Sequence, residues 1–258
     1  MVELDLSRSR ILVTNDDGIN APGLKVLEKI AKTLSKDVWV VAPETEQSGT
    51  GHSLTLTQPL RMRKLAKQRF AVSGSPTDCV LFAICQLMAG ELPDLVLSGV
   101  NRGANIGDDV TYSGTVAAAM EATILGLPAI ALSQQTNDEK IAHWPTATQY
   151  APDIIRKLIA AGWSSDVFMN VNFPDCPPKD VTGVSVVAQG RRKAGYDIRE
   201  CVDPRLHAYY WIGPAVSRTP RAGNTDYQAI ERREIAITPL HMDLTHRGAL
   251  RTLKKKFQ

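Results

Sequence analysis

Residues 10–18 read RILVTNDDG, an apolar run that ends in an asparagine, two adjacent aspartates and a glycine. The aliphatic residues of 11–14 predict a short buried strand, and the polar residues after them predict a tight turn. Residues 22–35 then place apolar side chains at helical spacing, with a proline in the first turn. A second strand is predicted at 38–42. A strand, a polar turn, a helix and another strand form the repeating unit of a parallel sheet.

The same alternation continues to residue 189. Helices are predicted from Ser75 to Gly90 and from Ser113 to Gly126, each with a serine that can cap its first turn. Further strands are predicted at 95–98, 129–132, 167–171 and 184–187. The fold class is therefore α/β, a mostly parallel sheet with helices on both faces.

The alternation of strand and helix patterns stops at residue 190. Residues 190–230 are rich in Arg, Gly, Pro and Tyr and show only short strand patterns such as 208–212, which predicts an extended arm rather than a plain loop. Strand character resumes at 235–238. We therefore predict a core at 1–189, an arm at 190–230, and a return strand with a C-terminal tail at 231–258. From residue 190 onward there are 14 Lys and Arg against 7 Asp and Glu, so this part is basic.

Composition excludes several classes of protein. The 258 residues are 43% hydrophobic and 22% charged, as in a globular chain rather than a disordered one. The start lacks a signal-peptide pattern, and no apolar run is long enough to cross a bilayer, so we expect a cytoplasmic protein without a membrane partner. The four cysteines form no C-x-x-C motif. The G-x-G-x-x-G, P-loop, G-x-S-x-G and H-E-x-x-H motifs are also absent.

Three polar loops follow three predicted strands. Asp16 and Asp17 follow the first strand, and Ser48 lies in the loop after the second. The glycine-punctuated stretch 99–109 follows the third and leads to a helix that starts near Ser113. Because ligands bind beyond the carboxyl ends of strands in open parallel sheets, we expect these loops to converge.

Adjacent carboxylates repel each other, and their pKa values rise unless a cation neutralises them. Their hard oxygens, together with Ser and Asn oxygens, suit Mg²⁺ or Mn²⁺. The helix start at Ser113 offers backbone N–H groups to an anion. The plainer alternatives are an Asp-Gly turn with solvated carboxylates and a serine that only caps its helix. A metal beside an anion site favours phosphate-ester chemistry.

Five segments together resemble the SurE family of survival-protein nucleotidases, over about residues 10–246. They are VTNDDGINAPG, VVAPETEQSGTGHSLTL, SGSPTDCV, VLSGVNRGANIGDDVTYSGTVAAAMEA and ITPLHMDLT. The resemblance implies a Rossmann-like core and a divalent-metal-dependent phosphatase that uses one Mg²⁺ or Mn²⁺ per subunit. Its implied substrates are nucleoside 5′- and 3′-monophosphates and short polyphosphate. It also implies a homodimer or homotetramer in which the C-terminal hairpin arm is exchanged.

Residue roles carried over from these motifs fall into three groups. The metal ligands are Asp16, Asp17, Ser48 and Asn101. The phosphate site consists of Asn105, Ser113, Gly114 and Thr115. Further catalytic candidates are Asp243 and His246, with His246 as acid for the leaving group. In this hypothesis, the metal polarises the phosphoryl group and positions the attacking water, while Asn105 and Ser113 stabilise the developing charge.

Three alternatives remain open. Asp16 could act as a nucleophile that forms an aspartyl phosphate. The basic stretch 191–221, with Tyr196, Tyr209, Tyr210 and Trp211, could serve a non-catalytic nucleotide- or RNA-binding module, because aromatic rings stack on bases. We favour instead a protomer–protomer contact for these aromatics and expect no nucleic-acid partner. The third alternative is a structural component of an oligomer.

Overall fold

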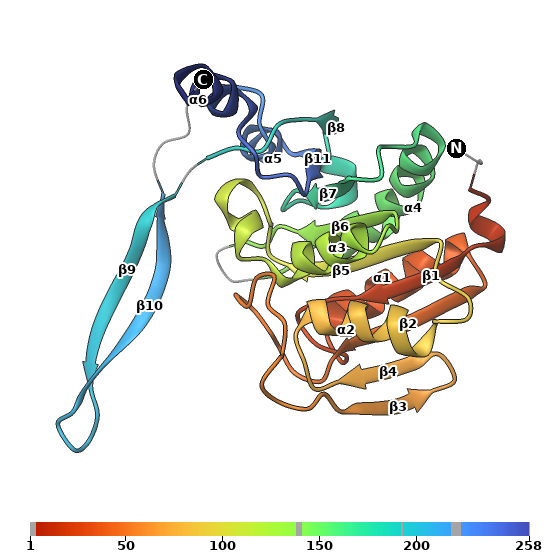
Figure 1. Ribbon diagram of the computed structural model, residues 1–258, viewed down its shortest axis with the longest axis horizontal. Helices are drawn as coiled ribbons and strands as arrows, with labels where there is room; N and C mark the ends of the chain where they lie inside the picture. Colours follow the sequence, from red (N-terminus) through yellow and green to blue (C-terminus); the bar gives the residue numbers. More distant parts are fainter. Residues whose placement is uncertain (1–3, 138–140, 192, 218–222, 258) are drawn as a thin grey trace.

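A computed structural model describes residues 4–137, 141–191, 193–217 and 223–257. In this part of the chain a nine-stranded sheet has the order β3-β4-β2-β1-β5-β6-β7-β11-β8 (Figure 1). Its strands are β1 (Arg10–Thr14), β2 (Asp37–Pro43), β3 (Met62–Ala66), β4 (Arg69–Val72), β5 (Leu95–Arg102), β6 (Ala129–Gln134), β7 (Val167–Phe173), β8 (Gly183–Val186) and β11 (Glu234–His241).

Six strands that are neighbours in the sheet run parallel to one another, in the order β4, β2, β1, β5, β6 and β7. β3 pairs antiparallel with β4 at one end of the sheet, and β11 pairs antiparallel with β7 near the other. β8 is parallel to β11. The predicted mostly parallel sheet is confirmed, and its antiparallel strands lie outside the parallel centre.

Helices cover both faces of the sheet, as predicted. α1 (Pro22–Leu34) and α4 (Trp144–Ala161) pack on one face, and α2 (Pro76–Phe82) and α3 (Gly114–Ile124) pack on the other. Successive residues of β1 point to opposite faces of the sheet. Ile11 therefore joins the core under α1, and Leu12 joins the core under α2 and α3.

Several elements differ from the sequence prediction. The helix expected to reach Gly90 ends as an α-helix at Phe82 and continues as a π-helical turn, Ala83–Leu87. The prediction missed the β3–β4 pair and α4, whose interior Pro152 interrupts an otherwise helical pattern. It also missed α5 (Asp226–Glu231) and the amphipathic α6 (Arg247–Phe257). Short 3₁₀ helices lie at Leu6–Arg8, Gly107–Thr111 and Pro178–Asp180.

The predicted arm contains a long hairpin. β9 (Lys193–Val202) and β10 (Ala208–Ser217) pair antiparallel as a separate two-stranded sheet, which projects from the body of the molecule (Figure 1). Residues 192 and 218–222 of the arm lie outside the described residues. None of the helices in the described part combines the length and apolar character that crossing a bilayer requires.

Candidate active site

The strand order places the topological switch point of the sheet between β1 and β5. From β1 the chain moves outward to β2 on one side, whereas β5 pairs with the other side of β1. Ligands bind at such a switch point, beyond the carboxyl ends of the strands. Asp16 and Asp17 lie in the turn just after β1, and Asn101 is the second-to-last residue of β5. The topology therefore brings the first and third predicted loops to the same edge.

Asp16 is buried against the first turn of α3. Its side chain accepts a hydrogen bond from the Thr115 hydroxyl and interacts with the backbone N–H groups of Thr115 and Gly114. A Cβ on Gly114 would lie 2.7 Å from the Cβ of Asp16, so only glycine permits this close approach. Burial raises the pKa of Asp16, although these hydrogen bonds offset part of the effect. The carboxyl group is thus held at the positive end of a helix dipole.

Asp17 lies beside it in a more open position. The backbone N–H of Arg102 donates to Asp17 Oδ2 at 3.1 Å, which connects the β1 loop to the end of β5. Burial and the nearby charge of Asp16 raise the pKa of Asp17 to about 6. Within the described residues neither aspartate belongs to an ion pair with a side chain. Such a pair of acids would be stabilised by a bound cation.

Ser48 and Asn101 supply neutral oxygens near the two acids. The Gln47 N–H donates to the Asp16 carbonyl at 2.8 Å, which brings the neighbouring Ser48 to this edge. The Asn101 side-chain nitrogen donates to the Gly103 carbonyl at 2.8 Å, so its oxygen is the atom suited to a cation. The Ser48 hydroxyl donates to Glu46 at 2.8 Å.

The chemistry of these donors fits a hard divalent cation. The described part of the chain has no group of three or more His, Cys, Asp or Glu side chains placed to hold a metal. A cation here would therefore rely on two carboxylates, neutral oxygens, water and substrate. Mg²⁺ is commonly held in this way, through one or two carboxylates plus substrate phosphate.

The residues expected to bind phosphate are engaged within the protein. The Ser113 hydroxyl accepts a hydrogen bond from the Val116 N–H at 3.0 Å, which is the capping role considered as the plainer alternative. The Thr115 hydroxyl donates to Asp16. What the start of α3 offers an anion is therefore its backbone N–H groups and its dipole, rather than these hydroxyls.

Asn105 is held in a buried polar cage. Its backbone N–H donates to Asn172 at 2.8 Å, and its carbonyl accepts from Asn170 at 2.8 Å. Its side-chain nitrogen donates to the Ser133 hydroxyl at 2.9 Å. This cage was not predicted from the sequence. Two asparagines two positions apart in the apolar strand VFMNVNF signal it, because such residues share one face of a strand.

A second missed residue is Asp226, at the start of α5. Its buried carboxylate accepts hydrogen bonds from the N–H groups of Gly107 and Gly190, each at 2.8 Å. It thereby joins the loop after β5 to the root of the hairpin. The sequence TDYQ contains the T-x-x-Q pattern of a capping box, which signals the helix start but not this contact.

Asp243 and His246 lie at the opposite edge of the sheet. β11 runs antiparallel to β7 and pairs its last residue, His241, with the first residue of β7. Asp243 is an electrostatic neighbour of Asp166, which directly precedes β7. It pairs with Arg247 on α6, and His246 accepts a hydrogen bond from the Ala249 N–H at 2.9 Å. Within one chain the structure does not bring them to the two aspartates.

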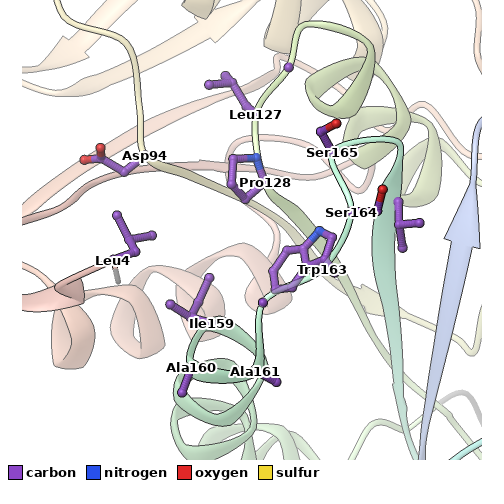
Figure 2. A pocket seen from close by; sticks show the side chains of 13 residues that line it. Leu4, Asp94, Leu127, Pro128, Ile159, Ala160, Ala161, Trp163, Ser164 and Ser165 are labelled. Carbon is purple, nitrogen blue, oxygen red and sulfur yellow. The ribbon is translucent and has the colours of Figure 1, made fainter. Parts of the chain in front are cut away.

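A large apolar hollow occupies this other edge (Figure 2). Its volume is about 1010 Å³, and Leu4, Pro128, Ile159 and Trp163 line it. Pro128 directly precedes β6, so the hollow faces the amino ends of the parallel strands. Size alone does not make it the active site, because the polar loops lie at the carboxyl ends.

Comparison with known proteins agrees with this architecture. Residues 11–196 match the family described as survival protein SurE. The 5′-nucleotidase SurE of Paramagnetospirillum magneticum is 57% identical over 98% of this chain and 97% of its own length. That of Caulobacter vibrioides is 54% identical over 95% of each chain. The crystal structure of the SurE protein from Aquifex aeolicus superposes with a TM-score of 0.82 at 36% identity, covering 96% of this chain and 100% of that one.

Fold and site define an α/β protein with two adjacent aspartates at the switch point of its sheet, next to the start of α3. The chain belongs to the SurE family, and the resemblance drawn from its motifs is confirmed.

Proposed function

We propose that the protein is a divalent-metal-dependent phosphatase that hydrolyses nucleoside 5′- and 3′-monophosphates to nucleoside and phosphate, and that it also cleaves short polyphosphate. The names of its relatives support the 5′-nucleotidase part of this proposal. The observation that carries it is the Asp16–Asp17 pair at the switch point, with the N-terminus of α3 packed against Asp16.

The proposed cofactor is one Mg²⁺ or Mn²⁺ per subunit. Asp16 and Asp17 would hold it, with Ser48 and Asn101 adding neutral oxygens. When bound, such an ion supplies Lewis-acid polarisation of the phosphoryl group and neutralises its charge.

The residues of this chain orient the reacting groups. The Thr115 hydroxyl and the N–H groups at the start of α3 fix the Asp16 carboxylate. The dipole of α3 carries roughly half a positive charge at this end and so attracts the phosphate. Hydrolysis adds water across the phosphorus–oxygen bond, and the proton of that water is transferred to the departing nucleoside oxygen.

We also propose that the protein acts as a homodimer or homotetramer in which the β9–β10 hairpin contacts a second copy of the chain. Large apolar side chains along the hairpin are exposed. Trp211 is 63% exposed and Ile212 is 75% exposed. A two-stranded hairpin standing alone is at best marginally stable in water, so burying these side chains against another protomer would stabilise it.

The test is phosphate release from a panel of 5′- and 3′-monophosphates and a short polyphosphate, with Mn²⁺, with Mg²⁺ and with EDTA. We expect release only with a metal ion and its loss in Asp16→Asn. Asp243→Asn, which changes an acid at the opposite edge, is the matched control. Metal-independent release, or full activity in Asp16→Asn, would overturn the proposal. A hydroxylamine-sensitive phosphoprotein would instead favour Asp16 as nucleophile.

A further inference from the structure

We infer that Tyr112, supported by Tyr196 of the hairpin, forms an aromatic platform on which the base of a nucleoside monophosphate stacks. This inference rests on the proposed function, because it assigns a place to the part of the substrate that does not react.

Position is the first argument. Tyr112 directly precedes Ser113, the N-cap of α3, and consecutive Cα atoms lie about 3.8 Å apart. Its carbonyl accepts a hydrogen bond from the Gly51 N–H at 3.1 Å, in the same loop as Ser48. Tyr112 therefore lies where the loop after β2 meets the helix start that packs against Asp16. A phosphate at that helix start would place its nucleoside near this ring.

Exposure and ring geometry are the second argument. Tyr112 is 49% exposed and Tyr196 is 41% exposed, although aromatic rings of this size usually bury much of their surface. Their ring centroids are 6.2 Å apart at 90°, an edge-to-face contact. Tyr196 lies near the root of the hairpin, whereas the Tyr209–Trp211 ring pair lies nearer the tip. Of the aromatic residues in the described part of the hairpin, Tyr196 is the one whose ring contacts Tyr112.

The third argument comes from the pair of hydrogen bonds that the Asp226 carboxylate accepts, here called the Asp226 clamp. The N–H groups of Gly107 and Gly190 share its carboxylate, and the Gln189 side chain donates to the Gly107 carbonyl at 2.7 Å. The root of the hairpin is therefore fixed to the segment that leads to Tyr112. A platform made of two elements needs this rigid connection, because mobile rings would lose entropy on binding.

Stacking accepts every base, because each base has an aromatic face. The platform therefore predicts that adenosine, guanosine, cytidine and uridine monophosphates are all substrates. The platform also predicts that a substrate without a base gains no affinity from stacking. Ribose 5-phosphate is that substrate, since it has the same reacting group and sugar.

The experiment compares Tyr112→Ala and Tyr112→Phe with the wild-type full-length chain in saturating Mn²⁺. For Tyr112→Ala we expect the KM for adenosine 5′-monophosphate to rise about tenfold, equivalent to about 1.4 kcal/mol. Its kcat and its kinetics with ribose 5-phosphate should not change. Tyr112→Phe keeps the ring and should behave as wild type. Tyr196→Ala should raise the same KM by a smaller factor, and Phe257→Ala, which removes an exposed aromatic ring at the end of α6, is the matched control.

Equal losses with both substrates in Tyr112→Ala would show a merely structural role and overturn the platform. An unchanged KM for adenosine 5′-monophosphate would overturn it too. If the wild-type chain hydrolyses no monophosphate, the proposed function fails separately. Calorimetric binding of adenosine 5′-monophosphate then decides the platform, with about tenfold weaker binding expected in Tyr112→Ala and equal binding refuting it.

Discussion

Replacing Gly114 by alanine tests whether the start of α3 must touch Asp16. The added Cβ would lie 2.7 Å from the Cβ of Asp16, 3.0 Å from its Oδ2 and 3.0 Å from the Cγ of Pro76. Carbon atoms in contact are normally about 3.5–4.0 Å apart, so helix and carboxyl group must separate by about 1 Å. Gly114 has no positive φ that would itself forbid alanine.

The expected effect on activity exceeds the effect on stability. A misplacement of about 1 Å in a catalytic arrangement can lower the rate about 100-fold. Crowding in a packed site costs about 1–3 kcal/mol, but alanine recovers about 1 kcal/mol through its higher helix propensity. We therefore expect kcat/KM to fall about 100-fold, while the free energy of unfolding falls by no more than about 2 kcal/mol.

The assay is phosphate release from adenosine 5′-monophosphate in saturating Mn²⁺, with urea unfolding measured on the same preparations. Gly90→Ala is the matched control, because its added Cβ would meet no atom within 4 Å and its φ is not positive. Activity of Gly114→Ala within threefold of wild type would refute the reasoning, since the contact with Asp16 would then have no part in the reaction.

Three further predictions concern groups outside this contact. Asp226→Asn has one oxygen acceptor where the carboxylate has two, so we expect the free energy of unfolding by urea to fall by about 2–4 kcal/mol. An unchanged midpoint of urea unfolding would contradict the Asp226 clamp. Burial raises the pKa of Glu28, but its partners, among them Arg69, lower it by more, and the net shift is below its ordinary value of 4.5. The stabilising contribution of Glu28 is therefore present above pH 4.5 and is lost as the pH falls through its lower pKa in the folded protein. Glu28→Gln should therefore make the stability of the protein depend less steeply on pH in acid. Parallel stability curves for Glu28→Gln and wild type would count against this. Asp243→Asn and His246→Ala should each keep kcat within threefold, whereas a tenfold loss would show that these residues take part in the reaction.

Local sequence patterns were enough to predict much of the fold. The apolar residues of 11–14 and 22–35 repeat at strand and helix spacing, and β1 and α1 form where these patterns predict them. The helix from Gly114 was predicted because its capping serine and alanine-rich run are adjacent in sequence. By contrast, α4 was missed because Pro152 interrupts its pattern, although the rest of that helix packs on the core.

In the candidate site, too, the sequence identified some residues, and only the structure shows how they contact one another. Adjacent aspartates after an apolar run identified Asp16 and Asp17 directly, because chemistry and position are both local there. That Thr115 supports Asp16 depends on a contact between residues 99 positions apart. That Asp226 holds Gly107 depends on residues 119 positions apart. No periodicity encodes such contacts.

The sequence by itself determined the α/β class, the acidic turn after the first strand and the family. Each follows from residues within a few positions of one another, where spacing and side-chain chemistry act directly. Only the tertiary structure decided which groups meet. Strand order set Asp16 against α3 and fixed the hairpin root beside Tyr112 through Asp226, while the reversed direction of β11 carried His246 to the far edge. Pairing direction and strand order depend on the packing of the whole sheet, and no single segment contains that information.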